Sequence, residues 1–105
     1  MKPARSRPQA RKDCREQVRY YRDVAGANVA ERLAGALRKA LEEIELNPGI
    51  GSPVLGKALG IEGMRTWRLS DFPLVLIYIE RSDHLDFVRL LGERQDIEDM
   101  IGDDC

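Results

Sequence analysis

Cysteine and histidine are scarce in this sequence. The 105 residues include two cysteines and one histidine, and the cysteines, Cys14 and Cys105, stand far apart. That spacing does not match the closely paired ligands of a metal site. Free thiols are the simplest interpretation, and they are typical of the reducing cytoplasm. We therefore expect a cytoplasmic protein with no bound metal and no cofactor.

Long apolar runs are also missing. No stretch approaches the roughly 20 apolar residues of a membrane-spanning helix. The basic residues at the N-terminus are not followed by an apolar core, so a secretory signal is not expected. The composition, 43% hydrophobic and 33% charged, is typical of a globular domain. We expect one domain over residues 1–105, with 1–7 and 102–105 loose, and we leave open whether 1–7 form a strand.

The net charge is only -1, but the charges are unevenly distributed. Residues 1–24 carry eight basic and three acidic side chains, whereas residues 92–105 carry six acidic side chains and a single basic one, Arg94. A basic end and an acidic end indicate opposite electrostatic faces. Such runs most often form solvated helix surface. Direct nucleic-acid binding by the basic end is the weaker alternative, because no aromatic residue interrupts the bases before Tyr20.

Two stretches have the period of amphipathic helices. The first opens at Pro8 and ends at Gly26, and its apolar residues are Ala10, Cys14, Val18, Tyr21 and Ala25. The second ends at Asn47, and its apolar residues are Val29, Leu33, Leu37, Ala40, Leu41 and Ile44. Asn28 is expected to cap the second helix, with Glu31 as its reciprocal partner. The short link between them predicts an antiparallel helical hairpin.

The remainder of the chain has the period of strands. It follows a loop rich in glycine and proline (residues 48–63), in which one helical turn is expected near Leu55–Leu59. Residues 64–69 form a strand with Arg65, Trp67 and Leu69 on one face and Met64, Thr66 and Arg68 on the other. The unbroken apolar run Leu74–Ile79 is expected to be a central strand covered on both faces.

A third strand is expected over Leu85–Leu91, followed by a short helix that Asp96 or a neighbour caps and that runs through Met100 and Ile101. Tight turns between the three strands predict an antiparallel meander. The helical hairpin is expected to cover one face of this sheet. The fold class is therefore α+β, with an antiparallel sheet of three to four strands.

Four segments of this chain resemble the ParE branch of the ParE/RelE toxin superfamily, and the likeness runs from about Pro8 to Ile101. Together they are fairly specific in order and spacing. The segments are Pro8–Asp13 leading into a helix that ends near Tyr20-Tyr21, Asn47–Pro53, Gly63–Leu69 followed by Phe72 and the strand 74–79, and Val88–Ile97.

The resemblance implies a toxin of a type II toxin–antitoxin system. Toxins similar to ParE bind DNA gyrase and block replication, whereas relatives similar to RelE cleave messenger RNA on the ribosome. Both are held inactive by an antitoxin whose disordered tail folds over the helical hairpin and a sheet edge. The implied partners are a ParD-like antitoxin, in a hetero-oligomer that provides any contact with nucleic acid, and gyrase. The alternatives are a ribosome-dependent mRNA endonuclease and an inactive toxin-fold protein that only binds its antitoxin.

The residues favour binding over catalysis. RNA cleavage needs a base, an acid and cations around one phosphate. Arg65, Arg68 and Arg89 could supply cations, but residues 92–105 contain neither tyrosine nor histidine. His84 is expected in a surface turn, and Tyr78 within the sheet. We therefore predict no catalytic residue.

Five residues are candidates for partner contacts. Arg65 beside Trp67 is the strongest pair, because arginine and tryptophan are common interface anchors. A core position for Trp67, with Arg65 at the sheet edge, is an equal alternative. Arg68 lies on the opposite face of the same strand. Arg94 either caps the final helix or contacts an acidic target, and Tyr20 lies off the main apolar stripe, where an antitoxin tail could cover it.

Overall fold

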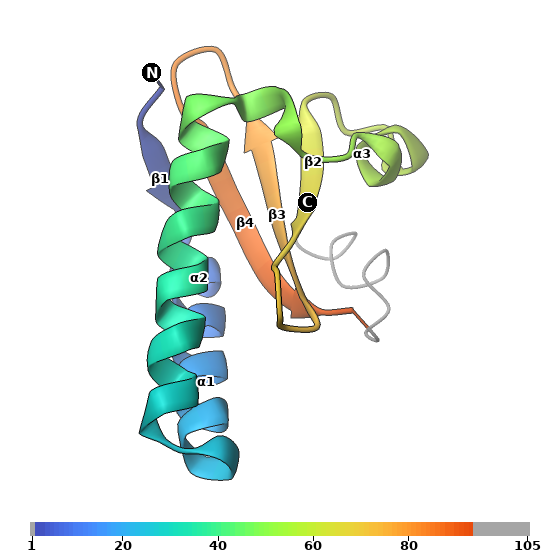
Figure 1. The fold of residues 1–105 in the computed structure, drawn as a ribbon. Coiled ribbons are helices and arrows are strands. Elements are labelled where there is room, and N and C mark those ends of the chain that lie inside the picture. The colour runs from blue at the N-terminus through green and yellow to red at the C-terminus, as the bar shows by residue number, and fades with distance from the viewer. Residues whose placement is uncertain (1, 94–105) are drawn as a thin grey trace.

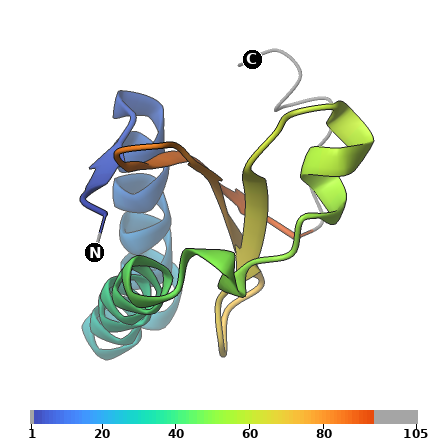
Figure 2. The same cartoon turned by 90° about the horizontal axis from the view of Figure 1, so that it is seen from above.

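The computed structural model describes residues 2–93, and two layers account for most of them. One layer is the antiparallel hairpin of α1 (Pro8–Ala25) and α2 (Ala27–Leu46). The other is a four-stranded sheet made of β1 (Ala4–Ser6), β2 (Met64–Arg68), β3 (Leu74–Glu80) and β4 (Leu85–Gly92). The hairpin lies on one side of the sheet and the short α3 (Val54–Leu59) on the other (Figures 1 and 2). The predicted α+β fold is confirmed.

The strands run in the order β1-β4-β3-β2. β2, β3 and β4 form the predicted antiparallel meander, with Met64 opposite Ile79 and Leu76 opposite Leu90. The fourth strand is β1, in the segment that the sequence left open. It pairs in parallel with β4, because the chain leaves it directly into α1 and does not turn back as a hairpin. The sheet is therefore mixed. The helix expected near Met100 lies outside the described residues.

β3 is the central strand that its apolar run predicts. All residues from Leu74 to Ile79 are buried. Leu74, Leu76 and Tyr78 pack with the hairpin residues Leu33 and Ile44, in a cluster that we name the hairpin-side core. Val75, Ile77 and Ile79 pack with Met64 on the opposite face, against Leu55 and Leu59 of α3. The apolar run is unbroken because both faces of this strand are covered.

The turn between the helices differs from the prediction. α2 begins at Ala27, and Gly26 alone separates it from α1. Gly26 has a φ of 97°, which glycine adopts without strain. The prediction that Asn28 caps α2 is wrong, because Asn28 already lies in the first helical turn and no side chain caps that end. Among the described residues, no helix is long and apolar enough to cross a membrane.

The loop after α2 is held to the sheet by a buried tyrosine. Tyr78 is fully buried. Its hydroxyl donates to the Pro48 carbonyl oxygen at 2.7 Å and accepts from the Gly51 amide at 3.0 Å. Burial is the main cause that raises the pKa of Tyr78 above its ordinary value, so the phenol keeps its proton for this bond. The loop includes the single 3-10 turn η1 (Pro48–Ile50).

Gly51→Ala is expected to lower the free energy of unfolding by about 1–3 kcal/mol, the range for overpacking a filled site. A methyl group there would lie 2.7 Å from the Tyr78 hydroxyl and 2.9 Å from the Thr66 carbonyl oxygen. Urea unfolding at neutral pH measures the change.

Gly35→Ala is the matched control. The nearest atom to its added methyl group is the Arg38 guanidinium, at 3.9 Å. This substitution within α2 is expected to raise stability by about 0.5–1 kcal/mol. A Gly51→Ala protein as stable as the parent would contradict the packing described for this loop.

Candidate functional site

Arg65 is tied to the loop that follows α2. Its Nη1 donates to the carbonyl oxygen of Gly51 at 2.8 Å and to that of Gly49 at 3.3 Å. These are loop carbonyls that Tyr78 does not use, so Arg65 and Tyr78 hold the same turn from two positions. The side chain predicted to contact a partner therefore also organises the loop.

Trp67 combines the two roles that the sequence left open, a core position and a surface for a partner contact. It is half-buried and packs against the hairpin-side core. It also lines a hollow of about 350 Å³ between α2 and the turn from β2 to β3. The basic residues Arg32 and Lys39 of α2 line the same hollow, and so does Phe72. The acidic residues Glu43 and Asp71 also line the hollow, so it combines an apolar anchor with charges of both signs and suits an amphipathic partner segment.

Tyr20 and Arg68 are not part of that hollow. Tyr20 is 57% exposed on α1, and its ring meets Tyr21 edge-on. Arg68 is exposed and forms an ion pair with Glu93 at 2.6 Å. Arg94 lies outside the described residues. The fold thus brings Arg65 and Trp67 to neighbouring places and leaves Tyr20 on the helical layer.

A buried ion pair between α1 and β4 escaped the sequence analysis. The Asp13 carboxylate is 7% exposed and accepts from Arg89 Nε at 2.8 Å. It also accepts from Gln9 and from the backbone amide of Leu90. β1 reaches β4 only as far as Phe87, so Asp13 supplies an acceptor for the β4 backbone beyond the end of β1. The two ionised residues are 76 positions apart in sequence, and no local pattern connects them.

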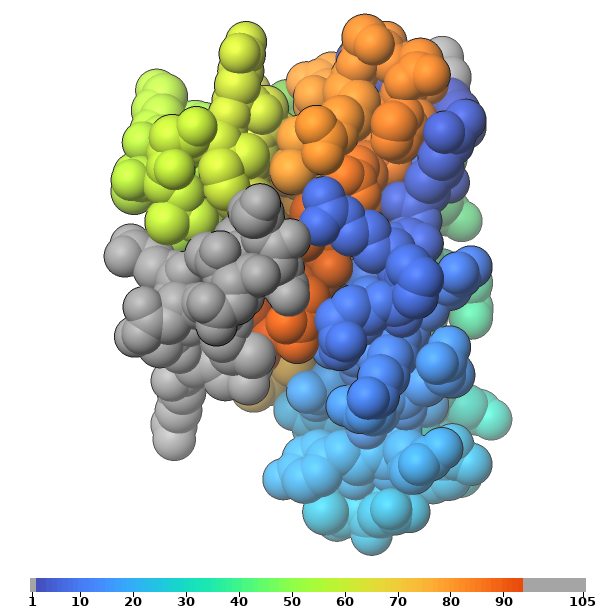
Figure 3. All heavy atoms as spheres, turned by 180° about the vertical axis from the view of Figure 1, so that it is seen from behind, coloured from blue at the N-terminus to red at the C-terminus, as the bar shows by residue number. Residues whose placement is uncertain are grey.

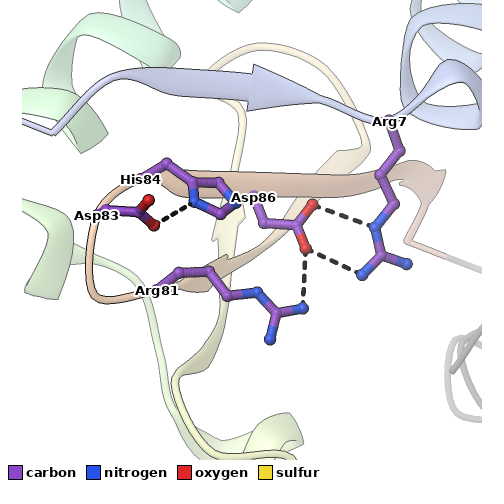
Figure 4. A network of polar contacts seen from close by, with 5 residues as sticks. All are labelled: Arg7, Arg81, Asp83, His84 and Asp86. Atoms are coloured by element: carbon purple, nitrogen blue, oxygen red, sulfur yellow. Dashed lines mark hydrogen bonds and ion pairs between the residues drawn. The ribbon is translucent and has the colours of Figure 1, made fainter.

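Among the described residues, the fold does not bring together the general acid and the general base that RNA cleavage needs around one phosphate. Arg89 is held by Asp13, and Tyr78 is buried. His84 lies in the turn between β3 and β4, where its Nδ1 is 2.7 Å from Asp83 (Figure 4). No group of three or more metal-ligating side chains is found within residues 2–93.

A second charged cluster surrounds Asp86 at the start of β4 (Figure 4). Arg7 donates two hydrogen bonds to its carboxylate, at 3.0 and 3.1 Å, and Arg81 donates a third at 3.0 Å. Burial by itself raises the pKa of Asp86, but the bonds and charges of the two arginines outweigh it and leave the pKa below its ordinary value. This cluster joins the segment before α1 to the β3–β4 hairpin.

The helical hairpin carries a groove that the sequence analysis did not anticipate. It is lined by α1 and α2 alone and has a volume of about 440 Å³. Its apolar lining is Cys14, Val18, Ala34 and Leu37, and its basic lining is Arg15, Arg19, Arg22 and Arg38. We name it the arginine groove. α1 forms much of one side of the molecule (Figure 3). The spacing of the arginines along α1 is the sequence feature that could have indicated this groove. The same spacing is also typical of a solvated helix surface.

Asp13→Asn is expected to lower the free energy of unfolding by about 3 kcal/mol, because it removes the charge of a largely buried carboxylate that Arg89 and the Leu90 amide both bind. Chemical denaturation measures the loss. Glu16→Gln is the matched control, since Glu16 is 59% exposed and lies 3.9 Å from Lys12. It should change stability by less than about 0.5 kcal/mol. Equal effects of the two substitutions would contradict the central place given to Asp13.

Asp86→Asn is expected to reduce the dependence of stability on acidic pH. A carboxyl whose folded pKa lies below its unfolded value of about 3.9 stabilises the fold above that pH. The contribution is lost as the pH falls through the folded pKa. Between about pH 6 and pH 3 the parent should therefore lose more unfolding free energy than the variant.

Denaturation at both pH values tests this expectation. Asp23→Asn, at an exposed position of α1, should keep the parent profile. An Asp86→Asn protein with that same profile would refute the role assigned to the Arg7–Asp86–Arg81 cluster.

Comparisons with known proteins agree with the fold. Residues 5–97 match the family described as the ParE toxin of type II toxin-antitoxin systems, parDE. A solved structure described as the chromosomal ParDE TA system from P. aeruginosa has the same fold, with a TM-score of 0.72 and 17% identity over 88% of this chain and 96% of that one. No curated protein sequence matches the chain. Because the family match covers most of the sequence, this chain belongs to the ParE toxin family of type II toxin–antitoxin systems.

Proposed function

We propose that this ParE-family toxin arrests growth by binding DNA gyrase in the cytoplasm and that a cognate ParD-like antitoxin neutralises it. The observation that carries the proposal is the family match over residues 5–97. Binding to gyrase follows from likeness to ParE toxins, so it rests on analogy with the family. The surfaces of the described residues are compatible with a protein that acts by contact.

The arrangement of polar groups disfavours the RNA-cleaving alternative. The cations expected to stabilise a phosphorane have other partners: Arg89 pairs with Asp13, Arg65 with loop carbonyls and Arg68 with Glu93. Within residues 2–93, His84 and Tyr78 are the notable acid–base candidates, and neither is placed for proton transfer to a bound phosphate. His84 is engaged with Asp83 in a hairpin turn, and the Tyr78 hydroxyl is bonded to the loop.

Two surfaces are available for the antitoxin. One is the hollow beside Trp67, with Arg65 on the same strand and Arg32 and Lys39 across from it. The other is the helical hairpin, with exposed Tyr20 and the arginine groove. An antitoxin tail that covers both would contact Tyr20, Arg65 and Trp67. Arg68, which is exposed and paired with Glu93, is proposed to contact the second partner, gyrase, together with Arg94.

The purified toxin is expected to inhibit gyrase supercoiling of relaxed plasmid in proportion to its concentration. Addition of the antitoxin should restore supercoiling, and expression of the toxin alone should arrest growth and induce the DNA-damage response. Sequencing of transcript ends soon after induction provides the comparison with RNA cleavage.

Intact supercoiling with excess toxin would reject gyrase as the target. Early cleavage of transcripts would support the endonuclease alternative, and harmless expression would support an inactive toxin-fold protein. The experiment thus separates the proposal from each of its alternatives.

A further inference from the structure

Four arginines form a stripe along α1. Arg11, Arg15, Arg19 and Arg22 follow one another at intervals of four, four and three residues, which places them on one side of a helix. All four are exposed. Among the described residues, none of the four forms an ion pair, and the pair present on this helix surface joins Lys12 to Glu16. The stripe is therefore a row of exposed arginines that form no ion pair with another described residue.

The stripe borders an apolar floor. Arg15, Arg19 and Arg22 line the arginine groove from α1, and Arg38 lines it from α2. Val18 and Leu37 are among the apolar residues between them. A second hollow of about 280 Å³ shares Val18, Arg22 and Ala34 and continues the groove to Ala27. The combined surface is apolar along its length and cationic at its rims, apart from Glu31 in the second hollow.

This combination selects an amphipathic acidic segment. Arginine pairs strongly with carboxylates and with phosphates. A nucleic-acid backbone would satisfy the rims but would leave the apolar floor unused. A peptide with apolar residues at helical spacing and carboxylates beside them would satisfy both.

The chain itself contains such a segment. Residues 94–105 include Ile97, Met100 and Ile101, at positions i, i+3 and i+4. They also include five acidic residues and one basic residue, whereas residues 2–93 include 16 basic and 13 acidic residues. The acidic residues of the segment are Asp96, Glu98, Asp99, Asp103 and Asp104. Charge and apolar spacing both complement the arginine groove.

A second copy is better placed than the same chain to supply this segment. The described chain ends at Glu93, whose amide donates to Pro73 and whose carboxylate pairs with Arg68, in the strands of the sheet layer. The groove is lined by helices alone, and the helical layer lies on one side of the sheet (Figure 2).

We infer that segment 94–105 of one copy docks in the arginine groove of a second copy. Each copy has both an arginine groove and a segment 94–105, so in a pair each copy can place its segment in the groove of the other. This inference rests on the proposed function in one respect only: an antitoxin tail that covers the helical hairpin would displace segment 94–105 from the arginine groove. Self-association and neutralisation then compete for one surface.

The test uses the full chain and measures its mass by light scattering over a range of concentrations. At low salt the parent is expected to self-associate, and at high salt the association weakens because the contact is ionic. Arg19→Glu with Arg22→Glu should weaken it at least about tenfold, and so should Glu98→Lys with Asp99→Lys. Arg5→Glu with Lys57→Glu is the matched control, since both side chains are exposed and lie outside the arginine groove and outside the hollow beside Trp67. It should leave association unchanged.

Mixing the two weakened variants identifies the contact. The mixture places an acidic segment opposite an intact groove, and a reversed segment opposite a reversed groove, so association should return to within about threefold of the parent. A labelled peptide of residues 94–105 should bind the parent and not the Arg19→Glu, Arg22→Glu variant, as measured by fluorescence anisotropy.

Three results would overturn the inference. They are a parent chain that is monomeric at low salt, variants that self-associate as the parent does, and a mixture that stays monomeric. Binding of labelled duplex DNA that is lost with the groove arginines, while the peptide fails to bind, would assign the surface to nucleic acid instead. Gyrase inhibition is measured separately, so a parent chain that inhibits gyrase but stays monomeric at low salt rejects this contact and leaves the proposed function standing.

Discussion

The ion pair between Asp13 and Arg89 is the constraint on which the arrangement of the layers depends. It is largely buried, and its carboxylate also accepts from the β4 backbone at Leu90. Opposite charges in a largely buried position stabilise the fold only when they are close and hydrogen-bonded, so this pair fixes the position of α1 relative to β4. α1 is thereby fixed along β4 where β1 ends, and α2 follows because a single glycine joins it to α1.

Three further contacts extend this constraint to the ends of the sheet. Arg7 and Arg81 converge on Asp86 and hold β1 and the β3–β4 turn together. Tyr78 and Arg65 attach the loop after α2 to the other edge. Asp86 and Tyr78, which receive these contacts or make them, are buried, and no buried side-chain nitrogen or oxygen among the described residues is left without a partner. The interior polar groups are therefore used for positioning.

This distribution of roles separates the interior from the surface. Arg89 and Arg65 of the sheet serve the fold, whereas Arg11, Arg15, Arg19 and Arg22 along α1 are exposed and carry no ion pair among the described residues. The partner contacts that we propose require such a division, because the scaffold must be rigid and the recognition surface must be free to accept a partner. The proposed antitoxin and the proposed second copy would both use the surface arginines of the hairpin.

The sequence by itself determined the helices, the central strand and the α+β class. Periodicity is a local property, and Leu33, Leu37 and the run Leu74–Ile79 show it without reference to the rest of the chain. It also placed Arg65 and Trp67 on one strand face. Only the tertiary structure decided that β1 pairs with β4, that Arg65 binds the loop after α2, and that Asp13 pairs with Arg89. Those partners lie far apart in sequence, and a side chain's partner depends on which elements the fold brings into contact.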